Sequence, residues 1–427
     1  MISRISKLFK VPIVRNILIM VTGTAGAQAV TMGLSPIITR IYGPEAYGIM
    51  GVFMAMVGFF GPIAALTYPI AIVLPKSNIY AKGIVRLSLY ITIGFAIAVF
   101  FSILLFKQSI VQLFKLEDIA SFLYLLPIVI LFSGFLQVTE QWLIRTKQFA
   151  ITSKVTFLQS LILQGSKVGI GVFYPFATVL VILTTLANGM KALMMLIFSK
   201  KSNHKQLTEL YEEPVSIKKV AKVYNDFPIF RAPQVFLNKA TEGLPVILLS
   251  ILFGPASAGF YSIGRTVLSA PSLLIGKAVG DVFYPRISEA ANDGESLTKL
   301  IKRATISLGA LGFLPFGLVI IFGPLLFSFI FGEEWLKAGE YARWIALWIF
   351  FMFISQPSIK ALPVLSAQAF HLKFTIFTLI IRTIALIGGY YLFSSDLMAV
   401  VLYSIFGAVL NIGLVYLTLQ ISKKFDK

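Results

Sequence analysis

Long apolar runs separated by short polar stretches make up most of the chain. A helix needs about 20 predominantly apolar residues to cross the hydrocarbon core of a bilayer. Runs of that length cover residues 17–39, 47–74, 84–106, 119–143, 155–174, 176–198, 228–253, 260–284, 304–331, 341–365, 370–393 and 396–420. The pattern therefore predicts an all-α polytopic membrane protein with twelve transmembrane helices, the fifth and sixth separated by a tight turn at Tyr174 and Pro175.

The loops between the runs alternate in their content of basic residues. With both termini placed in the cytoplasm, the cytoplasmic segments contain 24 Lys and Arg residues and the outside loops contain five. Basic residues of short loops collect on the cytoplasmic side of membrane proteins. The asymmetry predicts an even number of spans with both termini in the cytoplasm.

The longest loop, residues 199–226, falls near the middle of the chain on the predicted cytoplasmic side. We interpret it as a linker between an N-terminal lobe, residues 1–198, and a C-terminal lobe, residues 227–427, with six helices in each. Lys and Glu residues are mixed along the loop, which is typical of a surface helix lying at the lipid headgroups.

The two predicted lobes contain similar short sequences at similar places. An aromatic-Gly-Pro-x-x-x-Gly pattern occurs at residues 42–48 and again at 253–259, and an apolar-Pro-basic pattern occurs at residues 74–76 and at 284–286. Both pairs are separated by nearly half the chain, which predicts a parallel internal repeat with a central cavity between the lobes, the usual place for a transporter's substrate path. The alternative is that Gly-Pro turns recur by chance.

The composition agrees with a membrane protein. The chain is 57% hydrophobic and 13% charged, whereas soluble proteins are about 45–50% apolar and about 25% charged. Its mean hydropathy is +0.87. The formal net charge of +19 reflects basic loops beside a membrane, so no nucleic-acid partner is expected.

Charged residues inside the predicted spans are the candidates for function. A charge at mid-bilayer costs at least about 2.5–3.5 kcal/mol, so such residues usually face a wet cavity or a partner. We expect two of the basic ones, Arg231 and Lys360, to reach the headgroups from span ends. The predicted lining of a positively charged, substrate-binding cavity consists of Lys167, Lys191, Lys239, Arg265, Lys277 and Arg382.

The spans contain two clear acids, Glu140 and Glu242, whose roles the sequence leaves open between ion coupling and pairing. Glu242 stands three residues after Lys239, hence on the same helix face, and the two can neutralise each other. Glu140 is followed by Arg145 and Lys147, which suggests an interfacial pair.

Patterns of catalysis are missing from the sequence. With Cys 0 and His 2, there is no thiolate metal site, no disulfide framework and no clustered ligand set for a metal hydrolase. No phosphate-loop pattern for ATP is present. The sequence therefore predicts neither an enzyme nor a cofactor or metal.

Several short patterns distributed over the chain resemble one transporter family. They lie at residues 40–48, 71–76, 226–228, 244–245, 254–262, 271, 282–285 and 335–343. The chain resembles the Wzx-type polysaccharide and O-antigen repeat-unit flippases of the multidrug/oligosaccharidyl-lipid/polysaccharide (MOP) exporter superfamily. It departs from many of these relatives at Tyr68 and Pro69, where they carry an acid after the tyrosine, so no ion-coupling role is carried over to that position.

The resemblance implies twelve helices in two lobes of a bacterial inner-membrane protein. It implies translocation of undecaprenyl-pyrophosphate-linked oligosaccharide to the outer leaflet by alternating access, with the lipid-linked oligosaccharide, membrane lipid and other polysaccharide assembly proteins as partners. Two alternatives remain. An ion-coupled drug exporter of the same superfamily would need intramembrane carboxylates, and a membrane glycan polymerase or ligase would need a sizeable outside loop with catalytic residues.

Overall fold

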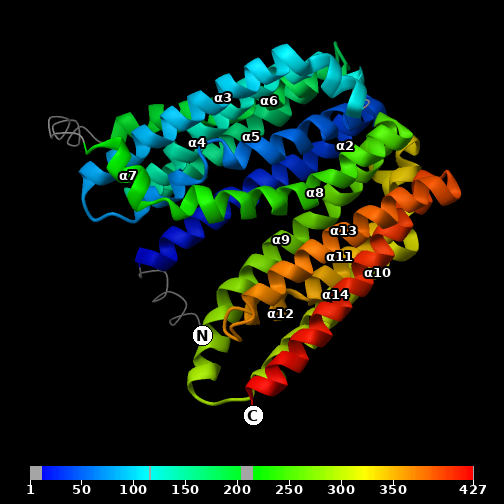
Figure 1. Cartoon of the computed structure of the whole chain (residues 1–427). Helices are drawn as coiled ribbons and strands as arrows, with labels where there is room; N and C mark the ends of the chain where they lie inside the picture. The colour runs from blue at the N-terminus through cyan, green and yellow to red at the C-terminus, as the bar shows by residue number, and fades with distance from the viewer. Residues whose placement is uncertain (1–11, 115–116, 203–214, 427) are drawn as a thin grey trace. The chain divides into compact units, whose positions relative to one another are not determined.

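A computed structural model describes the backbone of residues 12–114, 117–202 and 215–426, and the side chains of these except 12–18, 113–114, 200–202, 270–282 and 285. All regular structure in these ranges is helical, as predicted (Figure 1). The chain divides into two compact units, Met1–Ile247 and Leu248–Lys427. The lobes 1–198 and 227–427 with their linker stay a prediction.

The first unit contains the helices of the first six predicted spans and the start of the seventh. Its elements are α2 (Pro12–Phe60), η1 (Gly61–Ile63), η2 (Tyr68–Val73), α3 (Asn78–Phe114), η3 (Glu117–Ile119), η4 (Phe122–Leu125), α4 (Leu126–Arg145), α5 (Phe149–Gly171), α6 (Ala177–Ser202), α7 (Ile217–Val223), the π-helical turn η6 (Phe227–Arg231) and most of α8 (Ala232–Phe253).

The second unit contains the end of α8 and the remaining helices. They are α9 (Pro255–Asn292), α10 (Leu297–Phe331), η7 (Glu333–Trp335), α11 (Leu336–Ile354), α12 (Gln356–Ala361), α13 (Gln368–Phe393) and α14 (Asp396–Phe425).

In the described part of the chain, nine helices are long and apolar enough to cross a membrane. One of them, Ile19–Ile63, contains most of α2, whose 49 residues would extend about 70 Å as one straight helix. Gly43 interrupts its helical geometry, so α2 supplies the first span and the start of the second. Together with α5 and α9, which match the fifth and eighth predicted spans, the helices are consistent with twelve spans.

The repeat predicted from the Gly-Pro patterns is also present in the backbone. Gly43 has φ 70° and ψ 174°, and Gly254 has φ 91° and ψ 169°, a region that is essentially restricted to glycine. Each glycine precedes a proline that opens the next helix. The packing partners repeat as well: α3 with α4, α4 with α6 and α5 with α6 correspond to α10 with α11, α11 with α14 and α13 with α14.

The second span differs from the continuous helix predicted over residues 47–74. Regular α-helix ends at Phe60, and the chain continues through two short 3₁₀ segments, η1 and η2. Pro62 and Pro69 have no amide hydrogen and cannot continue the helical hydrogen bonding. Between them, Leu66 and Thr67 adopt left-handed φ values of 48° and 60°. Irregular backbone at membrane depth requires protein around it, and here α3, α4 and η6 pack against η2.

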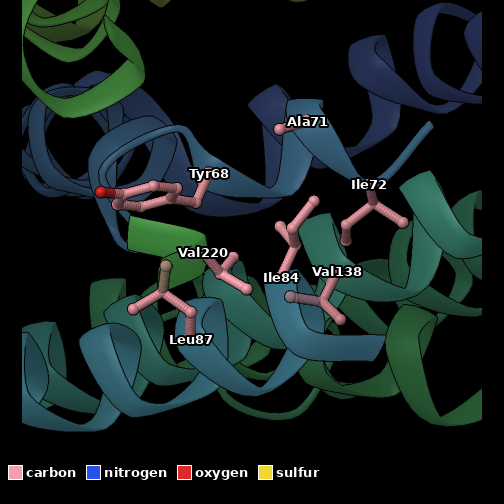
Figure 2. Packing of buried hydrophobic residues seen from close by; sticks show 7 residues of the cluster. All are labelled: Tyr68, Ala71, Ile72, Ile84, Leu87, Val138 and Val220. Carbon is pink, nitrogen blue, oxygen red and sulfur yellow. The ribbon is translucent and has the colours of Figure 1, made fainter. Parts of the chain in front are cut away.

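Residues 203–214 of the predicted surface helix in the linker lie outside the described residues, and the described end of the linker forms the short helix α7. Its lysines are exposed, but Val220 is fully buried, so the helix packs on α3 of the first unit rather than lying only at headgroups. Figure 2 shows the apolar cluster around Val220, which contains Tyr68, Ala71, Ile72, Ile84, Leu87 and Val138.

Candidate functional site

Both carboxylates that the sequence places in spans form ion pairs with lysines. Lys191 Nζ of α6 lies 2.7 Å from Glu140 Oε1 of α4, and the side chains are 19% and 30% exposed. Lys239 Nζ lies 2.8 Å from Glu242 Oε2 one turn later on α8. The structure therefore shows pairing for both acids.

The pair of Lys191 and Glu140 belongs to a polar interface between α6 and α4. One turn away from Lys191, Asn188 Nδ2 donates to Ser133 Oγ at 3.0 Å. On the same face of α4, Gln137 Nε2 donates to the carbonyl oxygen of Gly61 at 2.7 Å. Polar contacts between helices in a membrane stabilise their association.

Arg145 does not pair with Glu140, in contrast to the interfacial pair suggested by their spacing. Its Nη1 donates to the carbonyl oxygens of Ile72 at 3.0 Å and Pro75 at 2.6 Å, and its Nη2 donates to Asn78 Oδ1 at 3.0 Å. The broken second span leaves these carbonyls without helical partners, and a guanidinium offers enough donors to bind several of them. The spacing of residues along α4 could not indicate that Arg145 would bind carbonyls of the second span.

Lys167 lies inside the first unit, between α5 and α2. It is 8% exposed, and its Nζ lies 3.7 Å from Met50 Sδ. Its own carbonyl oxygen accepts a hydrogen bond from the Tyr42 hydroxyl at 2.8 Å. Lys167 is thus a basic residue that contacts no carboxylate among the described residues.

Arg382 of α13 lies inside the second unit between two aromatic rings. Its guanidinium carbon is 3.8 Å from the ring centre of Trp348 and 3.7 Å from that of Tyr403. Its Nε donates to the carbonyl oxygen of Tyr403 at 3.2 Å. Gly407 leaves the room for this arrangement, because a Cβ there would lie 2.9 Å from Arg382 Nε. Arg382 therefore joins α11, α13 and α14.

One donor of Arg382 is buried without a partner: its Nη2 has no hydrogen-bond partner among the described residues. The charges of Arg265 and Arg382 both act on Tyr261, so the two arginines share one neighbourhood.

The structure gives less detail about the surroundings of the remaining basic candidates. Arg265 is partly exposed on α9, and the side chain of Lys277 lies outside the described residues. Lys239 lies on α8 in the first unit, whereas Arg382 belongs to the second unit. The single cavity predicted to be lined by Lys239, Arg265, Lys277 and Arg382 stays a prediction. No group of three potential metal ligands occurs within the described ranges.

The sequence did not identify several residues that determine these environments. Trp348 and Tyr403 surround Arg382, while Gln137 and Arg145 bind the broken second span. An aromatic or polar residue in an apolar run is common in membrane proteins, so these had no distinguishing pattern. The signal available for the last two was the group of prolines at 62, 69 and 75, which predicts unpaired carbonyls nearby.

Comparisons with known proteins relate the chain to one protein family. The chain matches the family described as "Polysaccharide biosynthesis protein" over residues 37–340. It is 22% identical over 334 residues to the succinoglycan biosynthesis transport protein ExoT of Rhizobium meliloti (strain 1021), and this match covers 76% of the chain and 63% of that relative. The chain therefore spans less than two thirds of the length of this relative.

Solved structures with a similar fold belong to transporters. An inward-facing multidrug resistance MATE family transporter of the MOP superfamily has a TM-score of 0.68 at 12% identity, with 93% of this chain and 95% of that chain covered. The lipid II flippase MurJ in its inward closed conformation has a TM-score of 0.68 at 13% identity, with 96% and 90% covered. These likenesses show the fold, which is that of a multi-pass membrane protein.

Proposed function

Since the chain belongs to the polysaccharide biosynthesis protein family, we propose that it is a flippase that moves lipid-linked oligosaccharide across the cytoplasmic membrane. The resemblance noted in its sequence to the Wzx-type flippases of the MOP superfamily is confirmed by this family and by the fold. The substrate proposed is an undecaprenyl-pyrophosphate-linked repeat unit of O-antigen, capsule or exopolysaccharide.

The charge balance within the spans is the observation that supports this substrate. Glu140 and Glu242 are each engaged by a lysine, whereas Lys167 and Arg382 contact no carboxylate among the described residues. Each unit therefore contains a buried basic residue with no acid beside it among the described residues, which supports a positively charged interior. An anionic pyrophosphate headgroup complements such an interior, because phosphate oxygens accept charge-assisted hydrogen bonds from Lys and Arg.

Transport is proposed to follow alternating access. Basic side chains that become accessible from the cytoplasm bind the pyrophosphate, while the polyprenyl tail stays in the lipid. A change in conformation then exposes the glycan on the outside. Both termini are proposed to be cytoplasmic, and other polysaccharide assembly proteins are proposed to consume the product.

A cationic-drug exporter is the main competing function, since a MATE transporter shares the fold. Such a protein needs intramembrane carboxylates to bind its cation, and the two clear acids of the predicted spans, Glu140 and Glu242, are paired with lysines. A glycan polymerase or ligase needs catalytic residues in a sizeable outside loop, which the sequence does not contain.

Reconstitution into vesicles tests the proposal. The purified protein is incorporated into vesicles that contain a polyprenyl-pyrophosphate oligosaccharide labelled on its glycan, and the labelled glycan exposed on each face is measured. We expect faster transfer of this lipid than in protein-free vesicles, and no uptake of a fluorescent cationic dye. Dye transport without glycan transfer would contradict the proposal and support the exporter.

A further inference from the structure

Thr67 sits in a strained conformation inside the broken second span. Its φ is 60°, and a β-branched residue rarely adopts left-handed backbone. Such conformations are strained and persist only where the surroundings enforce them. Thr67 is also buried, so its hydroxyl has a defined direction that the surrounding structure maintains.

The Thr67 hydroxyl binds the first turn of the seventh span. Its Oγ1 donates to the carbonyl oxygen of Phe227 at 3.0 Å. The same carbonyl accepts the backbone N–H of Ala232, five residues later, which is the hydrogen bond of the π-helical turn η6. A single atom, Phe227 O, therefore links the break in the second span to the π turn.

A π turn changes the register of everything that follows it. A π turn contains one residue more than an α-helical turn, which is closed by a hydrogen bond between residues i and i+4. Converting the π turn to an α turn would therefore rotate the helix that follows by about 100° and shift that helix by about 1.5 Å along its axis. Pro233 follows the turn directly, and in a regular helix its ring would clash with the carbonyl of Ile229. The wider turn accommodates this proline.

The surroundings hold both sides of this contact in place. The Tyr68 hydroxyl donates to the carbonyl oxygen of Ala221 at 3.3 Å, next to Val220, which the cluster in Figure 2 encloses. Phe227 packs against the same cluster. The segment that leads into η6 is thereby fixed to the broken span.

The register of α8 has a steric consequence further along the helix. A Cβ on Gly243 would lie 2.5 Å from Phe59 Cε1, so the helix packs on α2 with its glycine at the contact. The residues on either side, Glu242 and Leu244, both have side chains. A rotation by one residue would place one of them against Phe59 and would turn the Lys239 and Glu242 pair to another face.

We propose that Thr67 is a positioning residue, whose hydroxyl maintains the π turn and thereby sets the register of α8 and the direction of Lys239 and Glu242. The register itself is independent of the substrate. Only the effect on transport rests on the proposed function, through Lys239 as a substrate-binding residue.

Spin labelling measures the register directly. The chain contains no cysteine, so single cysteines can be introduced at each position from 234 to 241 except Lys239 and labelled with a nitroxide. In the native chain we expect the most mobile labels at residues 234, 237 and 238, which are exposed. Thr67→Val keeps the shape and removes the hydroxyl, and it should move these maxima by one residue along the helix.

Two control variants isolate the hydroxyl. Thr67→Ser retains it and should keep the native pattern. Thr139→Val makes the same chemical change at another buried threonine of the first unit, whose hydroxyl donates within its own helix to Phe135, and should also keep the native pattern. An unchanged pattern in Thr67→Val, or an equal change in Thr139→Val, would overturn the proposal.

A shortened chain tests the same idea without relying on the stability of Thr67→Val alone. Deleting Phe230, which is 70% exposed, together with Pro233→Ala converts the π turn to an ordinary helical turn and restores the register of α8. In this background, adding Thr67→Val should change neither the label pattern nor glycan transfer. If Thr67→Val were as damaging there as in the full chain, its role would be general packing and the proposal would be wrong. Absence of glycan transfer in the native chain with the expected label patterns would instead contradict only the proposed function.

Discussion

Single basic residues in the membrane helices of this protein occupy three different environments. Lys191 and Lys239 face carboxylates, Lys167 faces a thioether, and Arg382 lies between aromatic ring faces. A planar, weakly hydrated guanidinium suits the aromatic site, whereas a compact ammonium does not. The environment of each residue thus indicates whether its removal should affect folding or substrate binding.

Arg382→Ala is expected to destabilise the second unit. It removes two cation–π contacts, each worth about 0.5–2 kcal/mol, and leaves a void between α11, α13 and α14. Less folded protein and a lower melting temperature in detergent should result. Arg382→Lys should recover only part of the loss, because it keeps the charge but not the stacking plane.

Arg303→Ala provides the matched control, since Arg303 is an exposed arginine on α10 of the same unit. It should melt like the native protein. If Arg382→Ala were fully stable and only glycan transfer were lost, Arg382 would act directly on the anionic substrate, as the sequence predicted.

The stability of a single helix depends on the hydrogen-bond partners of the backbone groups at its ends. The first four N–H groups of a helix lack partners within it; in α10 two of them bind Asp426 at the end of α14, and that of Lys299 binds Ser296 Oγ. Asp426 Oδ1 accepts the N–H of Leu297 at 2.9 Å, and its Oδ2 accepts the N–H of Thr298 at 3.1 Å and the Ser296 hydroxyl at 2.9 Å. Partial burial raises the pKa of Asp426, but these hydrogen bonds outweigh that effect and bring the pKa below its ordinary value of 3.8.

Asp426→Ala should lower the stability of the second unit by about 0.5–2 kcal/mol, the usual cost of losing a helix cap. Because the pKa is lower in the folded protein, the stabilisation is present above the unfolded-state pKa and is lost as the pH falls through the folded-state value. The difference in melting temperature between the native protein and Asp426→Ala should therefore be constant near neutral pH and shrink in strong acid.

Asp426→Asn separates the cap from the charge. The amide oxygen of Asn still accepts hydrogen bonds, but the side chain has no carboxylate that can be protonated. The stability of this variant should therefore lack the part that Asp426 loses as the pH falls. An undiminished difference between the native protein and Asp426→Ala at acid pH would contradict the assignment of the carboxylate to the cap.

At the scale of the whole molecule, the order of helices in the first half of the chain recurs in the second half. Within each unit, corresponding pairs of helices pack together, and the glycines that begin the second helix of each half share an unusual backbone conformation. Six helices in each half would give the two halves the same orientation in the membrane. A parallel repeat therefore requires an even number of spans before the second half begins.

Topology can be measured with reporter fusions at the middle and the end of the chain. A reporter joined after Lys205 or after Lys427 should be active in the cytoplasm, because basic residues are concentrated on that side, 24 against five. A fusion after Gly254, in a predicted outside loop, should report from the periplasm. Periplasmic activity after Lys205 or Lys427 would contradict the twelve-span arrangement.

The sequence by itself determined the class of the protein and the placement of its helices. A bilayer leaves no water for backbone groups, so each span must be a long apolar helix, and long apolar helices are visible in sequence. The turn at Tyr174 and Pro175 lies between α5 and α6 as predicted. Gly43 and Gly254 had a readable pattern because only glycine tolerates their conformation, and proline follows each.

Only the tertiary structure decided which partner each buried polar group found. Arg145 binds carbonyls about 70 residues away, Glu140 pairs with Lys191 of another helix, and Thr67 contacts the turn at Phe227. Spacing along one helix predicts neighbours on that helix, as it did for Lys239 and Glu242. Contacts between helices depend on how the helices pack, because packing determines which of the many polar side chains on facing surfaces meet.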